Sequence, residues 1–372
     1  DDDTLPLDLS PLPLRLQQLL LNTFKRALLP SSPNTANGTE PRSESETLDL
    51  APLIQRLKTH LYNRDFASAF TDAGEDALRA YALRWSAGRA LGYAGVFRGV
   101  FGVLPRGVDD GRSSCSGGWH KGRCTRRRVV CVGGGGGAEI GALAAVWRDL
   151  AESGSQPGEP GVSVVAVDVA DWSGVVRRLD ASLHGADVAA SATATAALVH
   201  AGHAGTQGFR VGFRRADVLD LSDGDIGAIF GDEPAHSTAE AEEELESTAL
   251  VTLMFTLNEL FSTSMAKATG FLLRMTDSLQ PGAVLLVVDS PGSYSTLRLG
   301  KGEGGEQERR YPMKFLLDHA LLSVARGKWE RVFAQESRWW RRDAARLRYD
   351  VGPGAGLEDM RFQIHVYRRV GR

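Results

Sequence analysis

The feature that most constrains the fold of this chain is a run of five glycines at positions 133–137, within VVCVGGGGGAEIGAL (residues 129–143). A short apolar run precedes the glycines and a helix-like apolar pattern follows them, which is typical of a strand, a tight loop and a helix. Glycines provide no side-chain packing and cost conformational entropy on folding. A nucleotide-like ligand lying against the loop and the helix N-terminus is the usual reason for a bare backbone there.

From this stretch onward, strand and helix patterns alternate. Helices are predicted at residues 140–153, 172–183, 262–279 and 313–325. The alternation predicts an α/β fold, a seven-stranded, mostly parallel, Rossmann-like sheet with helices on both faces. Two insertions, residues 184–208 and 231–247, are interpreted as surface loops or short helices. The seven predicted strands are residues 129–132, 162–168, 209–213, 250–257, 283–289, 329–335 and 362–367.

The N-terminal part of the chain has a helical pattern instead. Apolar residues at helical spacing predict helices near residues 11–29, 50–61, 78–85 and 89–97. The organisation expected is an N-terminal helical region over residues 1–101, a basic Gly/Ser/Arg loop over 102–128 and the sheet domain over 129–372. Residues 31–47 are rich in Ser, Pro, Asn, Thr and Glu, which predicts a disordered linker within the helical region.

Composition and charge restrict the function classes. A hydrophobic content of 42% and a charged content of 24% are ordinary for a globular protein, and the net charge of −3 means that any nucleic-acid site must be a local patch. Cys115, Cys124 and Cys131 are few and irregularly spaced, so we expect a reducing compartment, no disulfide framework and no metal site. No apolar run approaches the roughly 18 residues of a membrane span, and no signal-peptide pattern is present. The expected location is the cytoplasm, the nucleus or both, with the nucleolus included.

Polar residues at the strand ends indicate the ligand class. In a parallel sheet, ligands bind at the carboxyl ends of the strands. The first predicted strand ends in Gly133, Gly135 and Gly137, spaced G-x-G-x-G. Asp168 ends the second strand, where a carboxylate can accept hydrogen bonds from both ribose hydroxyls. Asp217, followed by Val218, comes after the third strand, at the place for an adenine ring. Together these residues predict an adenosine-containing ligand.

The residues after the glycines discriminate among adenosine ligands. A phosphate-binding P-loop needs Gly-Lys-Ser/Thr, whereas Gly137 is followed by Ala138 and Glu139. The nicotinamide dinucleotide pattern G-x-G-x-x-G/A is formally satisfied by Gly133, Gly135 and Ala138, so this alternative stays open. A carboxylate at Glu139 would repel a pyrophosphate, but it suits the sulfonium and ammonium charges of S-adenosylmethionine.

The glycine loop, Asp168 and Asp217 resemble the pattern of class I S-adenosylmethionine-dependent methyltransferases. One departure is Cys131, because that class often has an acidic residue two positions before the first glycine; Glu139 is the candidate to replace it. More specifically, the chain resembles the fungal family of large-subunit (25S) ribosomal RNA uridine-N3 methyltransferases. The resemblance is carried by residues 19–28, 60–70, 78–91, 130–143, 250–262, 285–297, 311–322 and 357–369.

This resemblance implies S-adenosyl-L-methionine as cofactor, and ribosomal RNA or a pre-ribosomal particle as partner. The implied reaction is attack by a uracil ring nitrogen on the sulfonium methyl group, which needs a base for the N3 proton. Asp289 is the first candidate for this base because it ends an apolar strand; the alternative is a cap for the turn that follows. Asn258 could bind the uracil carbonyls or the cofactor. Glu259 is the third catalytic candidate, or else a favourable charge at a helix N-terminus.

Two groups of arginines and aromatic residues are candidate RNA contacts. One group is Trp339 and Trp340 with the surrounding arginines, and the alternative is a partly buried aromatic pair with a solvated flank. The other lies on the third and fourth helices, where Arg79, Arg84 and Arg89 lie near aromatic residues, and the alternative is a solvated helix face with aromatic residues anchored in the core. Three hypotheses for function remain open: an RNA methyltransferase, a methyltransferase acting on a protein or small molecule, and a nicotinamide-dependent oxidoreductase or fold relic.

Overall fold

A computed structural model of the chain describes residues 7–30, 48–104, 124–153, 161–185, 197–199, 208–234, 245–302 and 305–371. The predicted linker over residues 31–47 lies outside these ranges, as does most of the insertion over 184–208. The same is true of Cys115.

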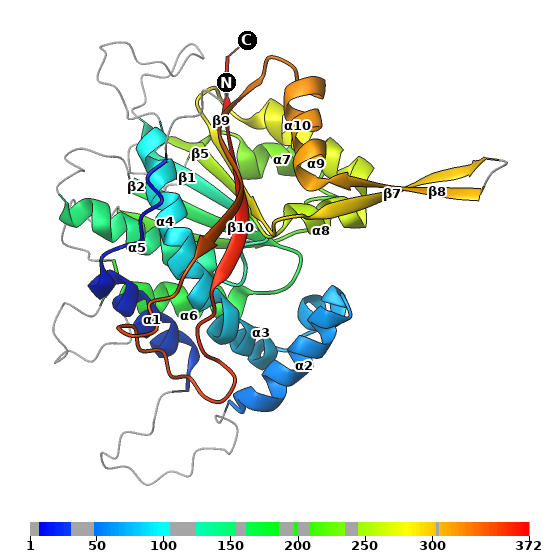
Figure 1. The fold of residues 1–372 in the computed structure, drawn as a ribbon. Helices are drawn as coiled ribbons and strands as arrows, with labels where there is room; N and C mark the ends of the chain where they lie inside the picture. The colour runs from blue at the N-terminus through cyan, green and yellow to red at the C-terminus, as the bar shows by residue number, and fades with distance from the viewer. Residues whose placement is uncertain are drawn as a thin grey trace, which may run out of the picture.

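A central sheet forms the middle of the molecule (Figure 1). Its order is β3-β2-β1-β5-β6-β10-β9, with parallel neighbours from β3 to β6 and antiparallel pairing of β10 with β6 and β9. A short β4 (Glu233–Pro234) pairs with β5. All seven predicted strands are present, so the α/β prediction is confirmed. The main strands are β1 (Cys124–Val132), β2 (Gly161–Asp168), β3 (Phe209–Arg215), β5 (Leu245–Met254), β6 (Val284–Asp289), β9 (Trp329–Trp340) and β10 (Met360–Arg369).

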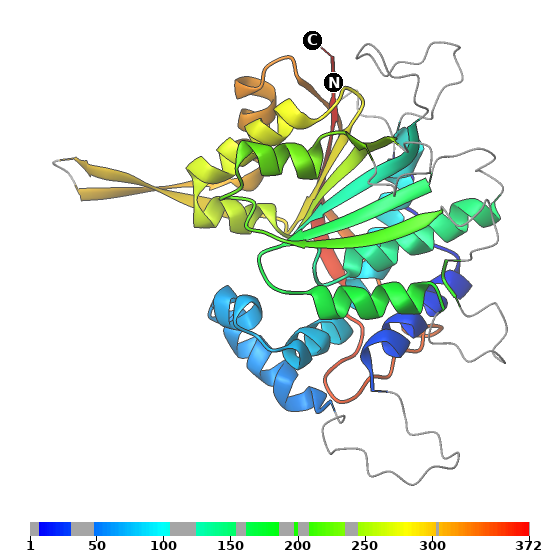
Figure 2. The same ribbon diagram turned by 180° about the vertical axis from the view of Figure 1, so that it is seen from behind.

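Helices cover both faces of the sheet (Figures 1 and 2). Each face has its own apolar core. The first face carries α1 (Leu14–Leu28), α4 (Ala87–Val103), α5 (Ala138–Glu152) and α6 (Ser173–Leu183). The second carries α7 (Asp223–Phe230), α8 (Leu257–Thr263), α9 (Met265–Ser278) and α10 (Met313–Asp318), which continues into the π-helical turn η6 (His319–Val324). The helix predicted over 262–279 is therefore preceded by a separate short helix, α8, and α7 was not predicted.

The N-terminal helices pack directly on the sheet domain. α1 and α4 lie against α5, and a Cβ at Gly141 of α5 would come within 2.7 Å of the Phe24 ring, so glycine permits this close approach. The remaining N-terminal elements are α2 (Leu50–Tyr62), the π-helical turn η2 (Ala67–Thr71), α3 (Glu75–Tyr81) and the π-helical turn η3 (Ala82–Ser86), which leads into α4. α1 and α4 are therefore part of the helical layer on the first face, whereas α2 contacts α3 and η2.

Two segments differ from the sequence predictions. β1 begins at Cys124, so Arg126 and Arg128 lie inside a buried strand and not in the predicted basic loop; both approach Glu246 of β5, at 3.6 and 3.3 Å. The second is a hairpin of β7 (Tyr294–Gly302) and β8 (Gly305–Pro312), which projects from the molecule after β6 (Figures 1 and 2). Its sequence is dominated by glycines and charges, which give no alternating apolar pattern.

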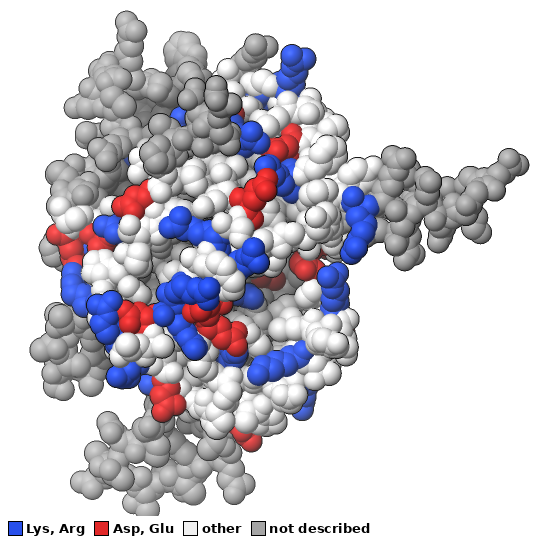
Figure 3. Space-filling model, viewed as in Figure 1, with Lys and Arg blue, Asp and Glu red and all other residues white. Residues whose placement is uncertain are grey.

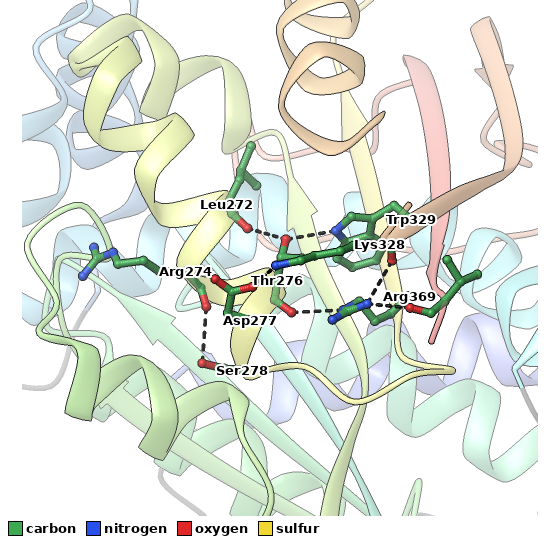
Figure 4. Close-up of polar contacts among 9 residues, drawn as sticks. Leu272, Arg274, Thr276, Asp277, Ser278, Lys328, Trp329 and Arg369 are labelled. Atoms are coloured by element: carbon green, nitrogen blue, oxygen red, sulfur yellow. Dashed lines mark hydrogen bonds and ion pairs between the residues drawn. The ribbon is translucent and has the colours of Figure 1, made fainter. Parts of the chain in front are cut away.

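A buried polar network fixes the end of α9 against the start of β9 and the end of β10 (Figure 4). The Trp329 indole N–H donates to the Thr276 hydroxyl at 2.9 Å, and this hydroxyl donates to the Leu272 carbonyl at 2.7 Å. The Arg369 guanidinium donates to the carbonyls of Thr276 and Lys328, at 3.1 and 3.2 Å. Side chains from three elements therefore satisfy one another where water is excluded.

Replacing Thr276 with Val should destabilise the fold. The substitution keeps the side-chain volume but leaves the Trp329 N–H without its acceptor, so we expect the free energy of unfolding to fall by about 1–3 kcal/mol. Urea denaturation followed by circular dichroism measures the change. The control is Ser278→Ala on the same helix, whose hydroxyl donates only to the Arg274 carbonyl at 3.3 Å. An equal loss of unfolding free energy in Thr276→Val and Ser278→Ala would contradict a special role for the network.

Candidate active site

A cavity of about 300 Å³ opens at the carboxyl ends of β1, β2, β3 and β5. This is where the strand order reverses, because β2 and β5 lie on opposite sides of β1. The predicted site residues that line the cavity are Gly133, Glu139, Asp168, Asp217, Val218 and Glu259. The lining does not include Gly135, Gly137, Asn258 or Asp289.

The glycine loop needs its glycines for conformation and for space. Gly133 and Gly137 have φ of 76° and 83°, in the left-handed region that side chains disfavour. A Cβ at Gly135 would lie 2.1 Å from the Trp172 ring. The Gly135 N–H instead donates to a carboxylate oxygen of Asp168 at 3.1 Å, so the loop is fastened to the end of the neighbouring strand.

The two aspartates sit at the strand ends as predicted. Asp168 accepts hydrogen bonds from the N–H groups of Gly135 and Ala170, at 3.1 and 3.2 Å, which fixes the carboxylate in the cavity wall. Burial raises the pKa of Asp168, although these hydrogen bonds oppose the shift. Asp217 accepts from the Leu219 N–H at 2.9 Å and thereby holds the turn that carries Val218 into the wall.

Glu139 is a buried acid in the first turn of α5. Its side chain is part of the cavity wall, only 3% of the residue is exposed, and its Oε1 atom has no hydrogen-bond partner in the described part of the chain. Burial raises the pKa of Glu139 to about 8, with the Arg89 charge opposing the shift. Cys131, the departure from the methyltransferase pattern, is also fully buried, and burial together with Glu139 raises the pKa of its thiol.

Arg89 of α4 faces the same cavity. Its guanidinium donates to the Tyr81 hydroxyl at 2.7 Å and lies over the rings of Tyr81 and Phe255, at 5.9 and 5.3 Å from the ring centroids. Phe255 has a positive φ of 58°, which turns the chain sharply between β5 and α8. The wall therefore carries a cation in addition to the carboxylate of Glu139.

The N-terminal segment supplies a complete wall that the sequence prediction missed. Arg89 belonged to a predicted RNA-facing or solvated helix face, but the structure places it in the cavity, and the arginines Arg79 and Arg84 hold the fold by bonding the Leu28 carbonyl and Glu358. The signal in the sequence that could have predicted this wall is the spacing of Tyr81, Arg89 and Tyr93, which are separated by multiples of four residues. The wall residues from this segment are Phe66, Phe70, Tyr81, Ser86, Arg89 and Tyr93.

The three predicted catalytic residues have different environments. Asp289 is buried outside the cavity lining and accepts hydrogen bonds from the Ser290 and Asn258 N–H groups, at 2.8 and 3.1 Å, and from the Ser293 hydroxyl at 3.3 Å. These contacts fit the turn-cap alternative. The Asn258 side chain has its Oδ1 buried without a described partner. Glu259 alone lines the cavity, and burial raises its pKa.

No helix within the described ranges is long and apolar enough to cross a membrane. Among the side chains that can be placed, no group of three or more His, Cys, Asp and Glu residues could hold a metal ion.

Comparisons with known proteins give the family. The family model described as "Putative SAM-dependent methyltransferase" matches residues 37–368. The 25S rRNA (uridine(2843)-N(3))-methyltransferase of Saccharomyces cerevisiae is 29% identical over 347 residues, which cover 87% of this chain and 79% of the yeast protein.

Solved methyltransferases are more distant. An O-methyltransferase family protein from Burkholderia thailandensis is 12% identical, with a TM-score of 0.39, over 94% of this chain and 82% of its own. The 1,6-didemethyltoxoflavin-N1-methyltransferase of the same organism is 13% identical, with a TM-score of 0.35, over 92% of this chain and 100% of its own.

The match of the family model decides between the two cofactors that the glycine loop left open. The chain belongs to the SAM-dependent methyltransferases and uses S-adenosylmethionine.

Proposed function

We propose that this methyltransferase modifies ring N3 of a uridine in large-subunit ribosomal RNA. The observation that carries the proposal is the 29% identity to the yeast uridine-N3 enzyme, which extends over 87% of the chain. The matched part includes the N-terminal segment that lines the cavity. The partner would be ribosomal RNA or a pre-ribosomal particle, and the protein would therefore act in the nucleus, with the nucleolus included, or in the cytoplasm.

The cavity fits S-adenosylmethionine by two observations. Gly133 brings bare backbone to the cavity wall, and the Oε1 atom of Glu139 is buried with no hydrogen-bond partner among the described residues. Asp168 would hold the ribose, and Asp217 with Val218 would hold the adenine. Glu139 would pair with the ammonium of the methionine moiety and Arg89 with its carboxylate. When bound, S-adenosylmethionine supplies an electrophilic methyl group.

Glu259 is our candidate for the base. Burial raises the pKa of this carboxylate, which makes it a better proton acceptor than an exposed glutamate. It would accept the N3 proton of uracil, and the electron pair left on nitrogen would form the new N–C bond while the methyl–sulfur bond breaks and its electron pair stays on the sulfur of the leaving S-adenosylhomocysteine. Asp289 would be a positioning residue. It accepts a hydrogen bond from the Asn258 N–H and so fixes the first turn of α8, which carries Glu259.

Aromatic side chains would enclose the reacting base. Phe70, Tyr81 and Trp172 form a group with ring centroids 4.9–5.8 Å apart, and all three line the cavity. A nucleobase that is flipped out of the RNA recovers stacking energy against these aromatic rings. The group also excludes water, which strengthens the electrostatic interactions of Glu139 and Arg89.

The test of the function is a nucleoside analysis of methylated RNA. Purified protein with isotopically labelled S-adenosylmethionine should place label in N3-methyluridine when it is given ribosomal RNA from cells that lack the gene. Mass spectrometry of the digested RNA identifies the product. Label in protein or in small molecules, with none in N3-methyluridine, would favour the alternative substrate class.

Glu259→Gln should remove the base without removing cofactor binding. We expect kcat to fall about 10²- to 10⁴-fold, the usual contribution of a positioned base. The dissociation constant of S-adenosylhomocysteine should stay within about twofold, as calorimetry can show. The control Glu330→Gln, on the distant end of β9, should retain full activity. A variant with normal kcat would show that another group takes the proton.

Asp168→Ala should weaken cofactor binding strongly. The variant loses the carboxylate at the ribose position and the acceptor of the Gly135 N–H. We expect the dissociation constant to rise more than tenfold, which corresponds to more than about 1.4 kcal/mol. Asp171→Ala removes an exposed carboxylate from the same loop and serves as the calorimetric control. Unchanged binding by Asp168→Ala would mean that the ribose lies elsewhere.

Cofactor affinity should rise with pH up to about pH 8. The pKa of Glu139 is about 8 in the free protein, so below this pH the carboxyl must lose a proton before it can pair with an ammonium. Each pH unit below 8 should then weaken binding by up to tenfold, whereas above pH 8 the cofactor's own amine loses its charge. Glu139→Gln should abolish the rise below pH 8 in calorimetric titrations. A rise that survives in this variant would contradict the assignment.

A further inference from the structure

An exposed tryptophan near the end of β9 has two arginine side chains against its ring, one from just after β9 and one from β10. Trp339 is 48% exposed, the guanidinium carbon of Arg341 lies 3.9 Å from the centroid of its ring, and that of Arg361 lies 5.7 Å away. Single exposed aromatic residues are common, but one that is bracketed by two guanidinium groups is a ready-made stacking surface. We call these three residues the Trp339 cluster.

The register of the sheet places the Trp339 cluster at the edge of the sheet where the parallel strands have their carboxyl ends. Trp340 packs against Gly92 of α4 on the first face, so Trp339, its neighbour in the strand, points to the second face, which carries α8. Trp339 pairs with Arg361, and two residues further along β10 Gln363 pairs with Asp289. Along the strand direction, Arg361 therefore lies about 7 Å beyond the end of β6, and Trp339 lies on the next strand, β9.

A second exposed aromatic residue lies at the base of the β7–β8 hairpin. Tyr294 is 51% exposed, and the Arg310 guanidinium lies 6.0 Å from its ring centroid. The Met313 N–H donates to the Ser293 carbonyl at 2.9 Å, which closes the hairpin base next to the end of β6 (Figure 1). Both aromatic–arginine pairs thus lie near the end of β6.

Basic and acidic side chains are intermixed on the face of the molecule that Figure 3 shows. Arg341 forms an ion pair with Asp359 at 2.6 Å, but its side chain is still largely exposed, and Arg361 donates to the Ser337 hydroxyl at 3.0 Å. These contacts orient both guanidinium groups beside the indole and leave them accessible. Arginine planes and aromatic rings in this arrangement suit unpaired RNA bases and their phosphates, whereas a large single-sign patch would suit duplex backbone.

We propose that the Trp339 cluster and the Tyr294–Arg310 pair bind the unpaired nucleotides next to the target uridine. Trp339 and Tyr294 stack on neighbouring bases, and Arg341 and Arg361 contact their phosphates. The proposal rests on the RNA substrate proposed above. A uridine whose N3 edge enters a cavity is unpaired, so its neighbours are also available for stacking.

Binding of a labelled single-stranded RNA tests the proposal separately from catalysis. The probe is a fluorescent 12-nucleotide RNA with one central uridine, added to the full chain saturated with S-adenosylhomocysteine and followed by anisotropy. Trp339→Ala should raise the dissociation constant at least about fivefold, and Trp339→Phe should restore most of the affinity because a ring is kept. Equal melting temperatures for these variants show that the fold is intact.

Salt dependence separates the arginine role from the tryptophan role. Arg361→Ala should reduce the slope of log affinity against log salt by about 0.7, the value for one phosphate contact on a single strand, whereas Trp339→Ala should leave the slope unchanged. The matched control is Arg326→Ala, which removes an exposed arginine just before the opposite end of β9. This control should alter neither the affinity nor the slope.

The outcomes distinguish this proposal from the proposed function. If the wild-type protein forms N3-methyluridine in RNA but Trp339→Ala binds the probe as tightly as the wild type, the surface proposal is overturned and the function stands. If Arg326→Ala weakens RNA binding as much as Arg361→Ala, the loss comes from the change in overall charge and not from a local contact, and the proposal also fails. A protein that neither binds the RNA nor methylates it refutes both.

Discussion

The hydrogen bond from the Gly135 N–H to the Asp168 carboxylate is the contact on which the geometry of the cavity depends. It ties the loop after β1 to the end of β2 at 3.1 Å, and the Gly133 N–H adds a second tie to the Val167 carbonyl at 2.8 Å. The left-handed glycines then turn the chain into α5. As a result, the contact between two strand ends also sets the position of Glu139 in the first turn of that helix.

The N-terminal helices determine the environment of Glu139 and therefore its pKa. α4 packs along α5 and brings Arg89 and Tyr93 over Glu139, so the carboxyl group is sealed from water and its pKa rises to about 8. Without this layer Glu139 would face solvent, and its pKa would stay near that of a free glutamate. A layer that covers the sheet thus also completes the active site, which explains why the sheet domain alone does not account for the cavity.

The sequence was informative where a local pattern determines the structure. Apolar runs and alternation predicted all seven main strands, and the parallel topology then required Asp168 and Asp217 to meet at one edge. The N-terminal wall was missed because helical spacing defines a face but not the element that this face meets. The β7–β8 hairpin was missed for a different reason: glycines and charged residues dominate its sequence, so no hydrophobic period marks it.

Asp289 and Glu259 show how the surroundings divide roles between two acids that sequence position alone makes equivalent. Both follow apolar strands at the same edge of the sheet. The oxygens of Asp289 accept three hydrogen bonds from Ser290, Ser293 and Asn258, which hold the carboxylate in place and oppose the rise in pKa that its burial causes. Burial also raises the pKa of Glu259, but the Glu259 side chain lines the cavity and that of Asp289 does not. Contact with the cavity, and not the direction of the pKa shift, is therefore what makes Glu259 the proposed base and Asp289 the proposed anchor of α8.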